Sequence, residues 1–227
     1  MNNPIPDLNS RIIFDSDTLL VINKPDNIPT SGRDINDKDS LQYWLIEHFD
    51  QMIWAIHQID ADTTGLNFFV KQKELVQLIH EKLGDKKTTK EYLAIVHRTP
   101  NWENGVWVEK SHIGYVDDRS LGIVNTGGKL AHSEFVVLDS SKNYSLILAK
   151  IYTGRTHQIR IHLSHLGYPL VGDEWYGDGP CTLHHRQALH AWKTTIPMLE
   201  PECFIARPAD DFIQLANKLG LKLQNDQ

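Results

Sequence analysis

The sequence predicts an α+β fold with a substantial core, and one observation supports each part of this prediction. Helix-like and strand-like segments mix irregularly along the 227 residues, without the repeated β-α unit of a parallel sheet. A content of 41% hydrophobic residues can bury a substantial core, in one domain or two small ones. We expect a single domain over residues 1–227, with its core at about 11–200 and no accessory domain at the N-terminus.

The first half of the chain contains strand-like runs separated by polar turns and two helical patterns. The second helix is expected to end at Gly84, a residue suited to a helix terminus. The strands are expected at 11–14, 18–23 and 66–70, and the helices at 41–49 and 73–83.

The second half is predicted to be richer in strands, at 90–96, 105–108, 133–138 and 144–152. A helix is expected to begin at Thr156, a plausible N-cap, and to stop at Gly167. Pro208 opens a last helix at about 208–219, with acidic residues in its first turn.

The stretch from Thr153 to Gly177 carries the strongest functional signal. Gly154 can adopt a backbone conformation closed to other residues, and Arg155 follows it at the expected start of a helix. The positive end of a helix together with a guanidinium suits a carboxylate or a phosphate. Taken alone, the same pattern is more often just a helix start.

Two carboxylates, Asp60 and Asp62, lie on a connection between apolar runs. Rigid scaffolds often hold reactive groups on such connections. A carboxylate kept ionised by an arginine and shielded from water can act as a nucleophile. For Asp62, a turn carboxylate capping Thr63 and Thr64 is the better interpretation.

Together these segments resemble the RluA-type family of RNA pseudouridine synthases. Its His-Arg-Leu-Asp and Thr-Ser-Gly-Leu motifs correspond to residues 57–60 and 63–66 here, which read His-Gln-Ile-Asp and Thr-Thr-Gly-Leu. Further matches fall in the family's order at 20–25, 90–96, 153–177 and 187–191. The resemblance implies the pseudouridine-synthase catalytic fold: a long bent mixed sheet, mostly antiparallel, with flanking helices and a central cleft.

The resemblance also implies residue roles. Asp60 corresponds to the catalytic aspartate, Arg155 to the arginine that pairs with it, and Tyr92 to the tyrosine that stacks on the target base. Without the resemblance, Tyr92 would be a half-buried strand residue. Substrate-binding positions are implied at His57, Gln58, Thr64, Gly65, Lys24 and Arg160.

Gln58 departs from the family, which usually has arginine there to occupy the space left by the flipped nucleotide. A glutamine can fill a gap and form hydrogen bonds, but it is neutral and cannot stack as a guanidinium does. Because base extrusion costs a few kcal/mol and least for an unpaired base, Gln58 favours a looped or unstacked uridine.

The implied function is isomerisation of uridine to pseudouridine in ribosomal or transfer RNA. The reaction breaks the C1′–N1 bond and rejoins uracil through C5 without loss of atoms or redox change, so no cofactor or metal is expected. One alternative is an RNA-binding or RNA-folding factor with little or no turnover, which Gln58 alone supports. A carboxylate-dependent hydrolase is another, but no second, water-activating carboxylate is evident.

The remaining composition bears on partners and location. The net charge of −6 is unusual for an RNA enzyme and predicts weak non-specific RNA affinity. Local clusters at Lys86, Lys87 and Lys90 and at Arg155 and Arg160 are the candidate RNA contacts. Without a signal peptide or an apolar stretch of about 20 residues, we expect a cytoplasmic monomer without an obligate protein partner.

Two patterns resemble ligand sites but favour other interpretations. Cys181, His184, His185 and His190 lack the spacing of a standard zinc site, so no metal is expected there. The glycine-rich segment 122–129 lacks the spacing and hydroxyl residue of a phosphate loop, and a hairpin-like turn is expected.

Overall fold

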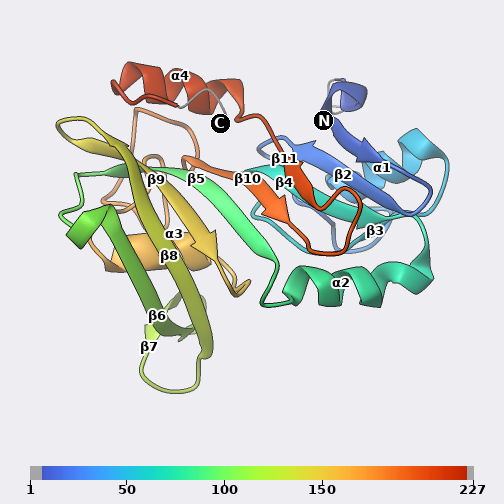
Figure 1. Cartoon of the computed structure of the whole chain (residues 1–227), viewed down its shortest axis with the longest axis horizontal. Coiled ribbons are helices and arrows are strands. Elements are labelled where there is room, and N and C mark those ends of the chain that lie inside the picture. The colour runs from blue at the N-terminus through green and yellow to red at the C-terminus, as the bar shows by residue number, and fades with distance from the viewer. Residues whose placement is uncertain (1–6, 224–227) are drawn as a thin grey trace. The chain divides into compact units, whose positions relative to one another are not determined.

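The structure is a computed structural model that describes residues 7–223. It is an α+β protein, as predicted, and its contacts divide the chain into two compact units. Unit 1 contains residues 7–88 and Ala191–Arg207, and unit 2 contains Thr89–His190 and residues 208–223. Figure 1 shows the course of the chain through its elements. Among residues 7–223, no helix has the length and apolar character needed to cross a bilayer.

Unit 1 is built on antiparallel strands in the order β1-β2-β4, with β10 next to β4. β3 pairs with β4, and β11 pairs with β10. The elements are η1 (Leu8–Arg11), β1 (Ile12–Asp15), β2 (Leu19–Lys24), α1 (Leu41–Phe49), β3 (Trp54–Ala55), β4 (Thr64–Val70), η2 (Lys73–Leu75), α2 (Val76–Gly84), β10 (Leu189–Thr195) and β11 (Cys203–Ile205).

β4 is buried along its whole length because both of its faces are covered. Phe69 joins the cluster made with Leu41 and Leu45 of α1. Its neighbour Phe68 points to the other face, as strand alternation requires, and meets Phe204 edge-on at a centroid distance of 5.4 Å. This continuous burial fixes the strand that follows the Asp60 connection.

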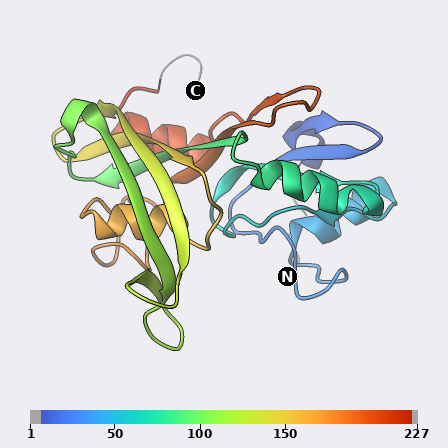
Figure 2. The same cartoon turned by 60° about the horizontal axis from the view of Figure 1, so that its bottom comes forward.

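Unit 2 contains the antiparallel order β5-β9-β8-β6-β7. α3 lies beside β7 and β8 (Figure 2), where its Ile161 packs with Ile113 and Ala131. The elements are β5 (Thr89–His97), η3 (Glu103–Gly105), β6 (Val106–Tyr115), β7 (Leu121–Val124), β8 (Lys129–Ser140), β9 (Tyr144–Ile151), α3 (Gln158–His165) and α4 (Asp210–Lys218), and the first two residues of β10 also belong to this unit.

Most predicted elements are confirmed, and β4, β5, β6 and β8 are longer than expected. The helix predicted at 41–49 is α1, and the C-terminal helix is α4. The helix expected from Thr156 instead begins at Gln158, because His157 takes a left-handed conformation at φ 56° and serves as the N-cap. The predicted stop at Gly167 is confirmed, with φ 85° just beyond the helix.

The hairpin expected at 122–129 is wrong in its pairing. β7 and β8 do not pair with each other, because each pairs with β6. The connection therefore crosses β6, and a Cβ on Gly128 would lie 2.8 Å from the Ile113 carbonyl oxygen. The glycines allow this close crossing.

Candidate active site

The loop that carries Asp60 is tied to the segment after β2 in unit 1. The Ile59 N–H donates to Thr30 Oγ1 at 3.3 Å, and the Ile28 N–H donates to the Ala61 carbonyl at 3.3 Å. The Asp60 carbonyl accepts from the Thr63 N–H at 3.0 Å, which closes a turn. The backbone on either side of Asp60 is therefore fixed, while the residue itself is half-buried.

Lys24 is fully buried directly beneath this loop. Its Nζ donates to the carbonyl oxygens of Pro25 at 2.8 Å, Ile28 at 2.8 Å and Ala61 at 2.6 Å. A buried ammonium is costly unless hydrogen bonds satisfy it, so these bonds join the end of β2 to the residue after Asp60. The geometry gives Lys24 a structural place in the loop, and its predicted contact with substrate stays a prediction.

His57 and Gln58 differ in burial. The His57 ring is half-buried, and its Nε2 accepts from the Phe68 N–H at 3.1 Å, which requires a lone pair on that nitrogen. Gln58 is exposed and donates from Nε2 to Ser31 Oγ at 2.7 Å. Gln58 is thus an exposed side chain of this loop that an incoming molecule can reach.

Thr64 and Gly65 begin β4 and are part of its buried face. Gly65 pairs with Lys24, and its φ of 106° is in the region that favours glycine. A Cβ at this position would lie 2.2 Å from the Ala191 carbonyl oxygen. Close strand packing therefore explains the glycine, and the predicted substrate contacts of both residues remain predictions.

In unit 2, Gln158 organises the turn that presents Arg155. Its Oε1 accepts from Thr153 Oγ1 at 2.7 Å and from the Arg155 N–H at 3.1 Å. Its Nε2 donates to the His132 carbonyl at 3.0 Å and to Ser133 Oγ at 2.9 Å. The buried amide thereby ties the 153–155 turn to β8.

The polar chain continues from Ser133 to His162, whose ring is fully buried. Its Nδ1 lies 3.0 Å from Ser133 Oγ and its Nε2 lies 3.1 Å from Ser111 Oγ. Burial lowers the pKa of His162 from its usual 6.5 to about 4, so the ring is neutral at physiological pH. A neutral ring can bond to both hydroxyls without placing a charge inside the unit.

Arg155 is half-buried, and its Nε donates to the Leu130 carbonyl at 3.0 Å. Lys90 of β5 lies near Arg155. Burial lowers the pKa of Lys90, and the positive charge of Arg155 lowers it further. Tyr92 lies on the same strand opposite Ala149 and is 9% exposed. The predicted arginine and tyrosine thus belong to a unit that also holds Lys90.

Arg160, predicted to bind substrate, is buried in an ion pair with Asp173. Nε donates to Oδ2 at 2.7 Å and Nη2 to Oδ1 at 2.8 Å, a two-point geometry. Burial raises the pKa of Asp173, but Arg160 and the N–H groups of Tyr176 and Trp175 outweigh it and keep the pKa low. These contacts indicate a structural role, and the predicted contact of Arg160 with substrate stays a prediction.

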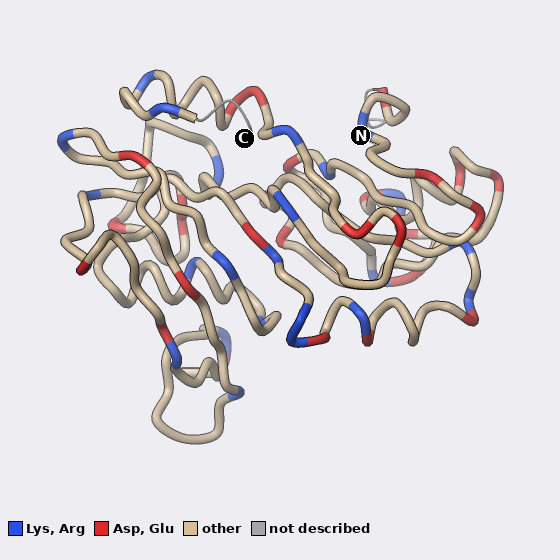
Figure 3. The backbone as a smooth tube through the Cα atoms, in the orientation of Figure 1, with Lys and Arg blue, Asp and Glu red and all other residues tan. Residues whose placement is uncertain are grey.

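Charged residues of both signs are spread along the chain, and lysines gather at the turn after α2 (Figure 3). The cluster expected from Arg155 and Arg160 offers RNA less positive charge than the sequence suggests, because Arg160 is buried and paired with Asp173. Sequence reasoning missed Thr30, Gln158 and His162. The last two lie within the stretch that carried the resemblance, but no local pattern identified their partners in β6 and β8.

Comparison with known proteins identifies the family. The RNA pseudouridylate synthase family model matches residues 18–165. Uncharacterized RNA pseudouridine synthase YhcT of Bacillus subtilis is 33% identical over 213 residues, which cover 88% of this chain and 69% of that protein. Ribosomal large subunit pseudouridine synthase C of Haemophilus ducreyi is 29% identical over 229 residues, or 93% of this chain and 69% of that protein.

A solved structure shares the fold. Human RNA pseudouridylate synthase domain containing 4 superimposes with a TM-score of 0.80 and 24% sequence identity, covering 96% of each chain. The match to the family model extends from β2 to the end of α3 and includes Asp60, Tyr92 and Arg155. This chain therefore belongs to the RNA pseudouridylate synthase family, whose RluA-type members isomerise uridine in RNA to pseudouridine.

Proposed function

We propose that this protein converts uridines of ribosomal RNA to pseudouridine and that Asp60 supplies the anionic group of the reaction. The observation that carries the proposal is the hydrogen-bonded frame around Asp60, formed by Thr30, Ile28 and Lys24. A carboxylate held in a fixed position is already oriented when substrate arrives, which lowers the entropic part of the barrier.

Tyr92 and Arg155 are proposed to act on the same uridine. The tyrosine ring would hold the uracil plane while the C1′–N1 bond is broken and the base is rejoined through C5. Arg155 is proposed as the cationic partner of the Asp60 carboxylate in this reaction. Gln158 supports this role by fixing the backbone at Arg155.

Ribosomal RNA is proposed as the substrate because the Haemophilus ducreyi relative is named a ribosomal large subunit pseudouridine synthase. Transfer RNA was an equal expectation from the sequence and is the second candidate. We also propose that the protein acts in the cytoplasm, as a monomer and without an obligate protein partner.

Tritium release from RNA carrying 5-tritiated uridine tests the reaction, because formation of the C5 bond expels that hydrogen. We expect release from RNA of cells that lack the gene and little from RNA of cells that have it. Absence of release from the deficient RNA, together with measurable RNA binding, would favour the factor without turnover. Free uracil in the products would instead indicate a hydrolase.

Mapping pseudouridines in the same two RNA populations identifies the substrate. The proposal predicts a site in ribosomal RNA that is lost without the gene. A lost site confined to transfer RNA would contradict the ribosomal part of the proposal and leave the isomerisation intact.

A further inference from the structure

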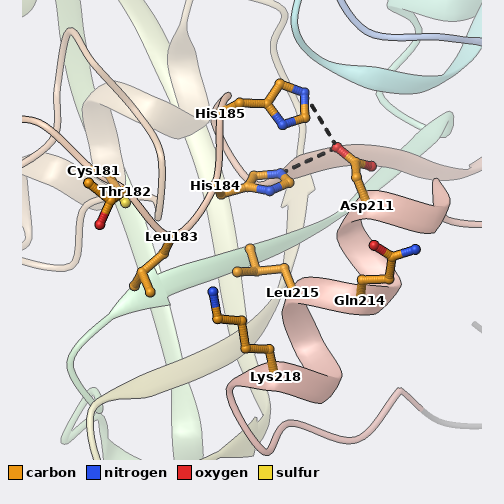
Figure 4. A pocket seen from close by; sticks show the side chains of 9 residues that line it. All are labelled: Cys181, Thr182, Leu183, His184, His185, Asp211, Gln214, Leu215 and Lys218. Atoms are coloured by element: carbon orange, nitrogen blue, oxygen red, sulfur yellow. Dashed lines mark ion pairs between the residues drawn. The ribbon is translucent and has the colours of Figure 1, made fainter.

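A pocket in unit 2 lies between the segment after residue 180 and α4 (Figure 4). Its volume is about 430 Å³. His184 and His185 point into it from the segment, and Asp211 faces them from the first turn of α4. Gln214, Leu215 and Lys218 form the helical wall. None of these residues belongs to the proposed uridine site.

The nitrogen and oxygen atoms of the three side chains converge. His184 Nε2 lies 3.5 Å and His185 Nε2 lies 3.9 Å from Asp211 Oδ2. One ligand atom from each residue lies within 4.8 Å of the other two. Both measured separations are long for hydrogen bonds, which are typically about 2.7–3.2 Å for a nitrogen donor and an oxygen acceptor.

The same separations are near those between ligands of one metal ion. Bonds of about 2.0–2.1 Å from zinc to nitrogen and oxygen place tetrahedral ligands roughly 3.3 Å apart. His184 is already near that spacing and is buried, whereas the His185 side chain is 63% exposed and would have to move closer to bind the same ion. The pocket also has room for water on the remaining coordination positions.

Asp211 has one oxygen suited to a cation. Oδ1 accepts from Arg186 Nη2 at 2.9 Å and from the Phe212 N–H at 2.8 Å. Oδ2 accepts from Arg186 Nε at 2.7 Å and faces both imidazoles. Since each carboxylate oxygen offers about two acceptor positions, Oδ2 can bind a cation while Arg186 remains in place and orients the group.

We propose that His184, His185 and Asp211 bind a divalent transition-metal cation of the zinc class. Two imidazoles and a carboxylate with open positions suit such an ion better than Mg²⁺ or Ca²⁺, which prefer oxygen ligands. The site departs from the sequence expectation because Asp211 lies on α4, outside the cysteine- and histidine-containing stretch. Arg186 adds a positive charge nearby, so we expect weaker cation binding than the same three ligands would give without it.

The bound cation joins α4 to the segment before β10, so its effect is on the stability of unit 2. Isothermal titration of the tag-free, EDTA-treated and dialysed full chain with ZnCl₂ tests binding. We expect about one zinc ion per chain and a rise in melting temperature on zinc addition, because a ligand that binds the folded state stabilises it. His185→Ala should weaken zinc binding at least tenfold and reduce the rise in melting temperature at the same zinc concentration.

His80→Ala, which removes an exposed histidine of α2, is the matched control and should bind like the wild type. Cys181→Ala should also retain binding, and the cobalt complex should lack thiolate charge-transfer absorption, because no thiol is in the proposed ligand set. Circular dichroism checks that His185→Ala is folded. The proposal is overturned by absence of saturable zinc binding in the wild type, by equal affinity in His185→Ala, or by loss of binding in either control.

Discussion

Gln58 is an exposed side chain at the position where the resembled family usually has arginine. Its Nε2 donates to Ser31 Oγ, a side-chain contact separate from the Ile59–Thr30 bond that fixes the backbone of the Asp60 loop. A change at this position should therefore alter how a nucleotide is accommodated while the frame around Asp60 stays intact.

Gln58→Arg should accelerate reaction at a uridine embedded in a stem more than at a looped one. The guanidinium can stack in the space left by the extruded nucleotide, and recovery of about 1 kcal/mol corresponds to about fivefold in rate. Initial rates on RNA oligonucleotides that present the same uridine in a stem or a loop measure this. Gln58→Lys adds a positive charge but no planar guanidinium, so it should increase the rate at the stem uridine less. Equal gains on both substrates would refute this account of position 58.

His162 makes stability depend on pH. Its pKa is about 4 in the folded protein against the usual 6.5, with burial as the main cause. Between these values the unfolded chain binds a proton that the folded protein does not. Stability therefore falls as pH decreases from about 6.5 to 4, by at most about 3 kcal/mol from this residue.

Urea unfolding of wild type and His162→Gln over this pH range tests the assignment. The glutamine variant should lose less stability on acidification than the wild type. His165→Gln, on the exposed face of the same helix, should behave like the wild type. An unchanged acid dependence in His162→Gln would assign the effect to other groups.

At the scale of elements, the Asp60 loop depends on Lys24 more than on its own sequence. One ammonium joins the end of β2, the turn after it and the residue following Asp60. The resemblance implied only a substrate-binding position for Lys24, because no local sequence pattern shows that a lysine is buried.

Lys24→Met should lower the free energy of unfolding by at least about 2 kcal/mol, since it leaves buried carbonyl oxygens without this donor. It should also reduce turnover, because the loop no longer holds Asp60 in one orientation. Urea unfolding and tritium release measure the two effects, and hydrogen exchange at Ala61–Thr63 reports the loop. Lys73→Met, at an exposed lysine, is the control. Wild-type exchange and turnover in Lys24→Met would contradict the positioning role.

Local sequence signal predicted α1 from the periodicity of its buried face, and α4 from Pro208 and the acidic residues that follow it. It failed at the start of α3, where the left-handed His157 depends on its tertiary setting, including a contact between its Nδ1 and the Tyr176 hydroxyl at 2.9 Å. It also failed at 122–129, since the crossing over β6 is a non-local pairing.

For the whole molecule, the family and the α+β class were predictable from the sequence. The motifs and their order along the chain can be recognised without knowing any tertiary contact. The burial of Arg160 by Asp173 and the network from Gln158 to His162 required the structure. The net charge of −6 leaves RNA recognition dependent on a few placed groups. The proposed catalysis depends on one of these groups above all, the carboxylate of Asp60.

Tritium release by Asp60→Asn, compared with Asp62→Asn, tests the central claim most directly. The two residues share the same loop, and each change removes one negative charge with almost no change in shape. We predict that Asp60→Asn lowers release by at least about a thousandfold, or about 4 kcal/mol of barrier, while RNA binding persists. Asp62→Asn should retain release within about tenfold of the wild type. Near-normal release from Asp60→Asn, or its loss from Asp62→Asn alone, would contradict the account.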